Sequence, residues 1–171
     1  DKSTGEVLGD MYSRALPFED IDSIVSSTGA DVVHLLRGKV ANASEACGTA
    51  YIGVQHGFGV RSLTLGNTII RDDCPIASFQ HEFGHNLGLT HDRTTVDEQD
   101  DSEGAYYYSY GSRVSGVYRT IMAYGARSEY PVYGTYSWPE VICDNSPCGT
   151  PPFESDSADN RRSIENTKRL V

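Results

Sequence analysis

The stretch HEFGHNLGLTHD, residues 81–92, decides the fold and the chemistry of this chain. On a helix, side chains four residues apart lie on the same face, so His81 and His85 project together and can bind one metal ion. Glu82 lies beside them, about 100° further round the helix. The pattern therefore predicts a helix that carries two metal ligands and a neighbouring carboxylate.

The second half of the stretch supplies a turn and a third ligand. Gly88 can adopt a positive φ and end the helix, after which the chain turns back. His91 then approaches the metal from a third direction. Three neutral imidazoles with an open coordination position are typical of a catalytic zinc site and not of a closed structural one. The sequence thus predicts one zinc ion bound by His81, His85 and His91.

The helix around the first two histidines is expected to run from about Pro75 to Leu87. Proline suits the first turn of a helix, and the acidic residues that precede it favour the positive end. One face of the helix is apolar and should be buried opposite the histidines. This apolar stripe consists of Ile76, Phe79, Phe83 and Leu87.

Upstream of this helix, the sequence predicts one further helix and three strands. Helically spaced apolar residues predict a helix over 16–27 that ends near Gly29. Within the second strand, Gly48 and Gly53 would allow another backbone to approach closely. Strands are expected over residues 30–38 and 47–54, and a further strand or a hairpin over residues 62–71.

Downstream of this helix, the composition of the chain changes. Residues 92–103 form an acidic loop, the following chain is rich in Tyr, Gly and Pro, and a final helix starts near Ser157. The predicted fold class is α+β, with an α/β upper lobe over residues 1–88 that holds a twisted mixed sheet and the central helix. The loop-rich lower lobe, closed by the C-terminal helix, spans residues 89–171. We expect residues 1–171 to form a single domain.

Composition excludes several classes of protein. The 171 residues include 14 basic and 24 acidic ones, giving a net charge of -10. Such acidity argues against a nucleic-acid binder and against docking on anionic membranes. No apolar run approaches the roughly 20 residues of a membrane span. The chain opens on a polar run, so any targeting segment is expected to have been removed or never included.

Four cysteines fit two disulfides and a secreted, extracellular protein. Cys143 and Cys148 are near neighbours in a Pro-containing loop, which favours a bridge between them. Cys47 and Cys74 remain, and they flank the strands that lead into the zinc helix. We therefore expect the pairs 47–74 and 143–148.

Four segments together carry a resemblance to a known family. They are CGTAYIGV (47–54), HEFGHNLGLTHD (81–92), RTIMAYG (119–125) and ADNRRSI (158–164). The extended histidine motif and the downstream methionine resemble the metzincin zinc endopeptidases. Asp92, directly after the third histidine, resembles the reprolysin (adamalysin) branch. The closest likeness is to secreted bacterial reprolysin-like enzymes, including the peptidyl-Asp metalloendopeptidases, and it covers about residues 30–171.

The resemblance implies roles for residues at and below the zinc. Met122 would form the hydrophobic base of the methionine turn beneath the histidines, with Gly88 and Asp92 as structural residues of the site. Reprolysins carry Pro two residues after the methionine, whereas this chain has Tyr124. That departure resembles astacins and serralysins, in which the tyrosine can ligate zinc and stabilise the tetrahedral intermediate.

A second departure concerns the N-terminal part of the chain. Only 80 residues precede His81, fewer than metzincins usually hold before the zinc helix. The first strand, first helix and second strand of a reprolysin are therefore expected to be missing. A missing N-terminal segment or a propeptide becomes a possible partner.

The resemblance implies a secreted zinc endopeptidase that acts as a monomer on proteins or peptides. Zinc would lower the pKa of a water, Glu82 would act as general base, and Tyr124 would help to stabilise the oxyanion. The substrate would lie extended and add a strand to the edge of the sheet. The edge residues expected to contact it are Thr49, Ala50, Tyr51 and Ile52.

Specificity is expected to come from the chain after the methionine turn, about residues 125–138. In metzincins this segment forms the wall of the pocket that receives the side chain just after the scissile bond. Arg127 at the base of that pocket would favour an acidic side chain. The tyrosines of the same segment would instead give an apolar or broad preference, and both interpretations stay open.

Two further classes of function compete with the peptidase. One is a metal-dependent binding or toxin module with weak or absent proteolysis. The other is a non-peptide zinc hydrolase, which the pairing of histidine motif and methionine turn disfavours. The acidic run 97–103 could also bind Ca²⁺, although a solvated loop is the simpler interpretation.

Overall fold

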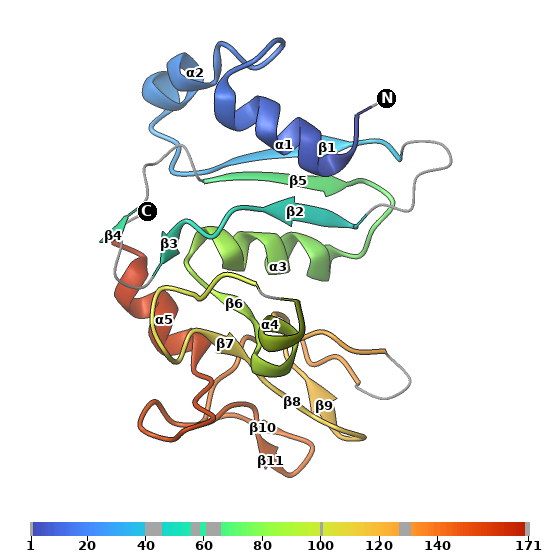
Figure 1. Ribbon diagram of the computed structural model, residues 1–171, viewed down its shortest axis with the longest axis vertical. Helices are drawn as coiled ribbons and strands as arrows, with labels where there is room; N and C mark the ends of the chain where they lie inside the picture. Colours follow the sequence, from blue (N-terminus) through green and yellow to red (C-terminus); the bar gives the residue numbers. More distant parts are fainter. Residues whose placement is uncertain are drawn as a thin grey trace.

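The computed structural model describes residues 2–39, 46–55, 59–60, 66–99, 101–126 and 131–169. Figure 1 shows α1 (Thr4–Ser13), α2 (Ile21–Thr28) and a small sheet at one end, α3 (Ile76–Asn86) beneath the sheet, and a loop-rich region with short strands at the other end. The predicted α+β class is confirmed. No helix in these ranges is long and apolar enough to cross a membrane.

The main sheet has three strands in the order β1–β5–β2. β1 (Val33–Arg37) and β5 (Asn67–Arg71) are parallel, and β2 (Gly48–Ala50) runs antiparallel to β5. The sheet is therefore mixed, as predicted, and β2 is its terminal strand. The predicted strand 47–54 is shorter in the structure, because the chain leaves the sheet after Ala50. It pairs again as β3 (Val54–Gln55) with β4 (Gly59–Val60).

Helix α1 (Thr4–Ser13) was not predicted from the sequence. It begins with a capping box, in which the Ser3 hydroxyl accepts a hydrogen bond from the Glu6 amide and the Glu6 carboxylate accepts one from the Ser3 amide. The helix packs against β5 and β2. It contributes Leu8 and Met11 to a buried cluster with Ile21 and Ile69.

Helix α2 (Ile21–Thr28) ends at Gly29, as predicted, but begins five residues later than expected. Gly29 has a φ of 67°, the left-handed conformation typical of a helix end. Residue Leu16 is 77% exposed and lies outside the helix. Pro17 disfavours helical angles at Leu16, and two turns, closed by the Phe18 amide on the Ala15 carbonyl and by the Ile21 amide on the Phe18 carbonyl, precede the helix.

Within the described residues, the loop-rich region contains three pairs of short strands and two helices. Helix α4 (Arg93–Gln99) lies where the sequence predicted an acidic loop, so that prediction was wrong for the first part of the run. Helix α5 (Asn160–Thr167) confirms the predicted C-terminal helix, and Asp159 caps it. The strand pairs are β6 (Thr90–Asp92) with β7 (Tyr110–Gly111), β8 (Arg113–Val114) with β9 (Tyr118–Arg119), and β10 (Ile142–Cys143) with β11 (Ser146–Pro147).

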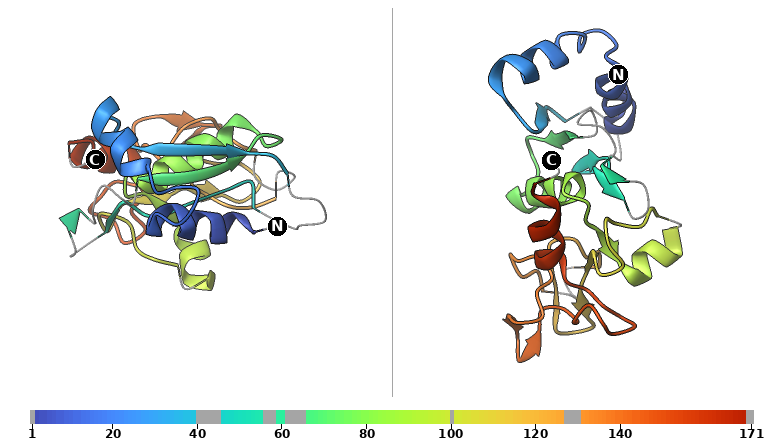
Figure 2. Two further views of the ribbon diagram at one scale, coloured as in Figure 1. Left: turned by 90° about the horizontal axis from the view of Figure 1, so that it is seen from above. Right: turned by 90° about the vertical axis from the view of Figure 1, so that its left-hand side faces the viewer.

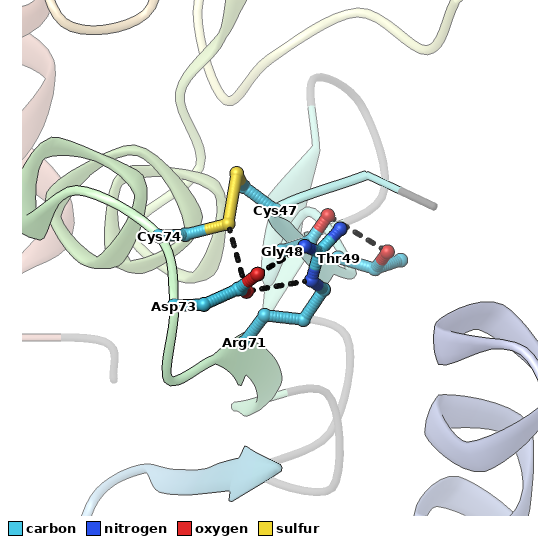
Figure 3. Close-up of a disulfide and its surroundings, with 6 residues drawn as sticks. All are labelled: Cys47, Gly48, Thr49, Arg71, Asp73 and Cys74. Carbon is cyan, nitrogen blue, oxygen red and sulfur yellow. Dashed lines mark hydrogen bonds and ion pairs between the residues drawn. A yellow bond between two sulfur atoms is a disulfide. The ribbon is translucent and has the colours of Figure 1, made fainter. Parts of the chain in front are cut away.

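Both predicted disulfides are present, Cys47–Cys74 and Cys143–Cys148. The first joins the residue before β2 to the residue that precedes Pro75 at the start of the central helix. Figure 3 shows this bridge beside the ion pair between Arg71 and Asp73, whose nitrogen and oxygen lie 2.7 Å apart. The backbone amide of Arg71 also donates to the Cys47 carbonyl over 2.9 Å. The start of β2 is therefore fixed covalently to the start of the central helix and by a backbone hydrogen bond to β5.

Candidate metal centre

The central helix α3 (Ile76–Asn86) lies between the sheet and the loop-rich region (Figure 1; Figure 2, right). Phe79 and Phe83 pack against the ring of His34 from β1, with ring centroids 4.6 and 5.8 Å away. Ile76 was predicted to be buried with them, but it is 76% exposed. It is the first residue of α3, whereas Leu87, at the other end of the predicted stripe, is buried. The buried stripe therefore starts one turn later than predicted.

The end of α3 is fixed to the sheet through Asn86. Its side-chain oxygen accepts a hydrogen bond from the Thr68 hydroxyl over 2.6 Å, and its amide donates to the Tyr51 carbonyl over 3.1 Å. A Cβ on Gly53 would collide with the Asn86 carbonyl oxygen, so this glycine allows the close backbone approach predicted for it. Gly88 has a φ of 84° and the chain then turns back, as predicted, into β6.

The three predicted histidine ligands come together at one point. His81 and His85 lie on α3, and His91 lies on β6. The Nε2 atoms of His85 and His91 are each 3.2 Å from Nε2 of His81. A search of the described residues for three or more His, Cys, Asp or Glu side chains close enough to share a metal ion finds these three histidines.

Each imidazole is oriented through its other ring nitrogen. Nδ1 of His81 lies 2.8 Å from the Ile121 carbonyl, and Nδ1 of His85 lies 2.9 Å from the Leu89 carbonyl. A carbonyl oxygen only accepts hydrogen bonds, so both Nδ1 atoms must carry the proton. Nδ1 of His91 likewise faces the Asp101 carboxylate at 2.7 Å. These partners leave three Nε2 lone pairs that face one another.

The donor set fits zinc. In a tetrahedral site with Zn–N bonds of about 2.0–2.1 Å, ligand nitrogens lie roughly 3.3 Å apart, close to the spacing of these Nε2 atoms. Burial lowers the pKa of His81 to about 4, and the charge of nearby Arg119 contributes to the shift. Burial also lowers the pKa of His85 well below its usual value. Both rings are thus neutral at pH 7, as ligands must be.

Glu82 is buried beside the histidines, and burial raises its pKa to about 8. A divalent cation held by the imidazoles would oppose this shift and favour the carboxylate. The space for its side chain depends on Gly48 in β2. A Cβ at that position would lie 2.5 Å from Cγ and 2.8 Å from Oε1 of Glu82. Gly48 therefore allows a side chain to approach, and not the backbone that the sequence predicted.

Met122 lies fully buried beneath the centre. It packs with Leu89 and Ile121 in a cluster that Tyr136 and Ile164 extend. A Cβ on Gly84 of α3 would lie 2.5 Å from the Met122 sulfur, so the glycine lets the methionine reach the underside of the helix. Gly84 lies between His81 and His85 in the sequence, so Met122 contacts the helix at the level of these two ligands.

Asp92 is the hub of a buried polar network. Its carboxylate accepts hydrogen bonds from the Thr95 amide and hydroxyl, which holds the start of α4. The same carboxylate accepts the Tyr124 amide over 3.0 Å and pairs with Arg113 Nε over 3.0 Å. Arg113 also donates to the Tyr124 carbonyl over 2.9 Å. The backbone amide and carbonyl of Tyr124 are therefore both held by hydrogen bonds to this network.

The Tyr124 ring lies against two of the histidines. Its centroid is 4.2 Å from that of His91 and 5.4 Å from that of His81, nearly parallel to the latter. Burial raises the pKa of Tyr124 to about 12, and the carboxylates of Glu82 and Asp101 contribute. Its hydroxyl therefore stays protonated at neutral pH and can serve as a hydrogen-bond donor.

Two cavities flank the histidines. The first, of about 270 Å³, is lined by Ala50, Tyr51, Ile52, His85, His91 and Asp101, among others. Thr49 does not line either cavity, and its hydroxyl donates to the Gly48 carbonyl. The second cavity, of about 360 Å³, is lined by His81, Glu82, Arg119, Ile121, Tyr124 and Val132, among others. Arg127, the predicted specificity residue, lies outside the described residues.

Three polar residues of the centre were missed from the sequence: Asp101, Arg113 and Arg119. Asp101 belongs to the acidic run considered for Ca²⁺, where it has a different task in orienting His91. Arg119 is the first residue of the segment RTIMAYG that carries the methionine turn, and this position was the signal in the sequence that could have identified it. In the structure it ends β9. Arg113 carries no sequence signal that separates it from a surface arginine.

Three imidazoles around one point, a buried carboxylate and a methionine beneath them define a mononuclear metal centre on an α+β fold. Residues 1–92 match the family described as metallo-peptidase family M12B reprolysin-like. This chain belongs to that family. The match begins at residue 1 and so includes α1 and α2, to which the sequence motifs do not extend.

Curated relatives are named peptidyl-Asp metalloendopeptidase. The protein from Pseudomonas aeruginosa is 27% identical over 159 residues, which cover 84% of this chain and 26% of that one. The protein from Xanthomonas campestris pv. campestris is 33% identical over 125 residues, covering 72% of this chain and 28% of the relative. The one from Pseudomonas fragi is 33% identical over 112 residues, or 63% and 67% of the two chains. The chain thus spans about a quarter of the length of the first two relatives.

A solved structure described as a chaperone–substrate complex superposes with a TM-score of 0.67. The superposition covers 99% of this chain and 27% of the other, at 18% sequence identity. At that identity the likeness shows a shared fold and no more.

Proposed function

We propose that this chain is the catalytic domain of a secreted zinc-dependent endopeptidase that hydrolyses peptide bonds in extended protein substrates. The observation that carries the proposal is the convergence of three Nε2 lone pairs beside the buried carboxylate of Glu82. Residues 1–171 would act as one metzincin-type domain, with the substrate cleft between the sheet and the loop-rich region. The two disulfides support an extracellular location.

His81, His85 and His91 would hold the zinc ion through their Nε2 atoms. Zinc bound there would supply Lewis-acid chemistry, lowering the pKa of a water and polarising the scissile carbonyl. Asp101 and the carbonyls of Ile121 and Leu89 fix the tautomer of each ring and raise its basicity. The three zinc ligands are therefore already oriented in the absence of substrate.

Glu82 would take the proton from the attacking water and deliver it to the leaving amine. Its buried position beside His81 leaves it close to both groups and away from bulk water. The Tyr124 hydroxyl would donate a hydrogen bond to the scissile carbonyl oxygen as negative charge develops there. The network of Asp92 and Arg113 supports that role, because it fixes the backbone of Tyr124 on both sides.

The substrate would lie extended along β2 and the residues that follow it. β2 is terminal in the sheet order, so within the described strands its second side carries no partner. Ala50, Tyr51 and Ile52 line the cavity beside His85 and His91, which supports contact with the part of the substrate before the scissile bond. An added strand would obtain affinity from its main chain.

Because the relatives bear the name peptidyl-Asp metalloendopeptidase, we extend the proposal to peptide bonds adjacent to aspartate. A library of peptides digested by the purified chain and analysed by mass spectrometry tests activity and specificity together. Cleavage should disappear with a chelator and return when zinc is added back. If one zinc is bound per chain and neither casein, gelatin nor the library is cleaved, the chain is a metal-dependent binding module instead.

A further inference from the structure

The cavity on the Glu82 side of the centre contains one fixed positive charge. Among the described residues that line it, Arg119 is the one Arg or Lys. The guanidinium is close enough to His81 and Tyr124 for its charge to act on both: it adds to the lowering of the His81 pKa and partly opposes the rise in the Tyr124 pKa that burial causes. The cavity on the opposite side is lined by a carboxylate, Asp101, and by no Arg or Lys among its described residues. A guanidinium thus lies on the Glu82 side of the centre, beside the Glu82 carboxylate itself, whereas the other cavity offers a carboxylate and no described Arg or Lys.

Arg119 is held firmly in place. Its backbone amide donates to the Pro131 carbonyl over 2.9 Å, and its carbonyl accepts the Tyr133 amide over 2.9 Å. Its Nη1 atom donates to the Ala123 carbonyl over 2.7 Å, next to Met122 in the methionine turn. The side chain is half-buried, and the hydrogen bond to Ala123 restrains the guanidinium beside the turn.

The chemistry decides which part of a substrate enters this cavity. If Glu82 delivers a proton to the leaving amine, the nitrogen of that amine must lie within hydrogen-bond distance of Glu82. That nitrogen belongs to the residue immediately after the scissile bond. The side chain of this residue must then extend into the cavity that Glu82 and Arg119 line together.

We infer that Arg119 is the specificity-determining residue of this chain, and that it selects an acidic side chain immediately after the scissile bond. The inference rests on the proposed peptidase function. A carboxylate in the cavity would meet a guanidinium already oriented by the turn, and a charge-assisted pair in a half-buried site is stronger than a neutral hydrogen bond. An acidic side chain on the other side of the centre would meet Asp101 and be disfavoured.

The test uses peptides that are identical except for Asp, Asn or Lys after the scissile bond. For the wild-type chain, we expect kcat/KM for Asp to exceed that for Asn by about 10- to 100-fold, the range for a hydrogen bond to a charged group. Arg119→Gln should bring this ratio close to one. Arg119→Lys keeps the charge without the planar fork, so its ratio should lie between the two.

Two controls identify the source of any change. Arg127→Gln tests the arginine that the sequence offered as one of two sources of specificity, and Arg169→Gln removes an exposed arginine near the C-terminal end of the described chain. Both should keep the wild-type ratio. A ratio that survives in Arg119→Gln within about threefold, or that is lost in Arg127→Gln, overturns the assignment.

Binding gives a reading that does not depend on turnover. In a Glu82→Gln background, the uncleaved Asp peptide should bind more tightly than the Asn peptide by fluorescence anisotropy, and Arg119→Gln should remove the difference. If the wild-type chain cleaves none of the peptides, the proposed function fails, and the binding comparison still decides the role of Arg119. Equal binding of both peptides to the Glu82→Gln chain would refute that role.

Discussion

Replacing Gly48 by alanine should impair Glu82 without touching a metal ligand. The added Cβ would lie 2.5 Å from Cγ, 2.9 Å from Cδ and 2.8 Å from Oε1 of Glu82. Carbon atoms in contact lie about 3.5–4.0 Å apart, so the Glu82 side chain must shift by roughly 1 Å. Because Glu82 is buried and its Cγ is near its own backbone, the shift cannot be absorbed by a flexible tip.

A displacement of about 1 Å at a reacting group costs on the order of 100-fold in rate. Overpacking a buried site costs about 1–3 kcal/mol of stability. We therefore expect Gly48→Ala to lower kcat on a fluorogenic peptide by about 100-fold and the free energy of unfolding by about 1–3 kcal/mol. Zinc content should stay at about one per chain, because the three atoms nearest to the added Cβ all belong to Glu82 and none to a histidine.

The matched control is Gly9→Ala. A Cβ on Gly9, in α1, would have no heavy atom within 4 Å, and alanine suits a helix interior better than glycine. Its kcat should match wild type, and its unfolding free energy should rise by up to about 1 kcal/mol. If Gly48→Ala keeps kcat within about threefold of wild type, the position assigned to Glu82 against β2 is wrong.

Three other perturbations address the metal, the oxyanion and the fold. Asp101→Ala removes the carboxylate that orients His91, so the zinc dissociation constant measured by chelator competition should rise about 10- to 100-fold; an unchanged constant would show that the contact is incidental. Tyr124→Phe should lower kcat with little change in KM, the pattern of a contact made in the transition state, and an unchanged kcat would reject this role. Replacing Cys47 and Cys74 together by serine opens a bridge across 27 residues and should lower the unfolding free energy in urea by about 3–4 kcal/mol, whereas an unaltered midpoint would contradict it.

The central helix, the three strands and both disulfides could be predicted because their signals are local. Two histidines four residues apart, a following glycine and short apolar runs need only the geometry of a helix or a strand. The capping box of Ser3 and Glu6 was an equally local signal for α1, but the polar composition of the first residues concealed it. Helix α4 also had a local signal, since Asp92 accepts the Thr95 amide at its start.

The polar partners of the centre could not be predicted in this way. Arg113 reaches Tyr124 across 11 residues, and Asp92 reaches the same residue across 32. Such pairs form only once the strands and turns have brought distant segments together. Ile76 shows the converse error, because helical periodicity states which residues share a face and not how far the neighbouring layer extends.

The most direct test of the central claim is the turnover of Glu82→Gln loaded with zinc. We expect this variant to keep about one zinc per chain, since the three histidine nitrogens are unchanged, while kcat on a cleavable peptide falls by about 100- to 10,000-fold. Turnover within tenfold of the wild-type chain at equal zinc content would contradict Glu82 as the general base, and with it the proposed mechanism.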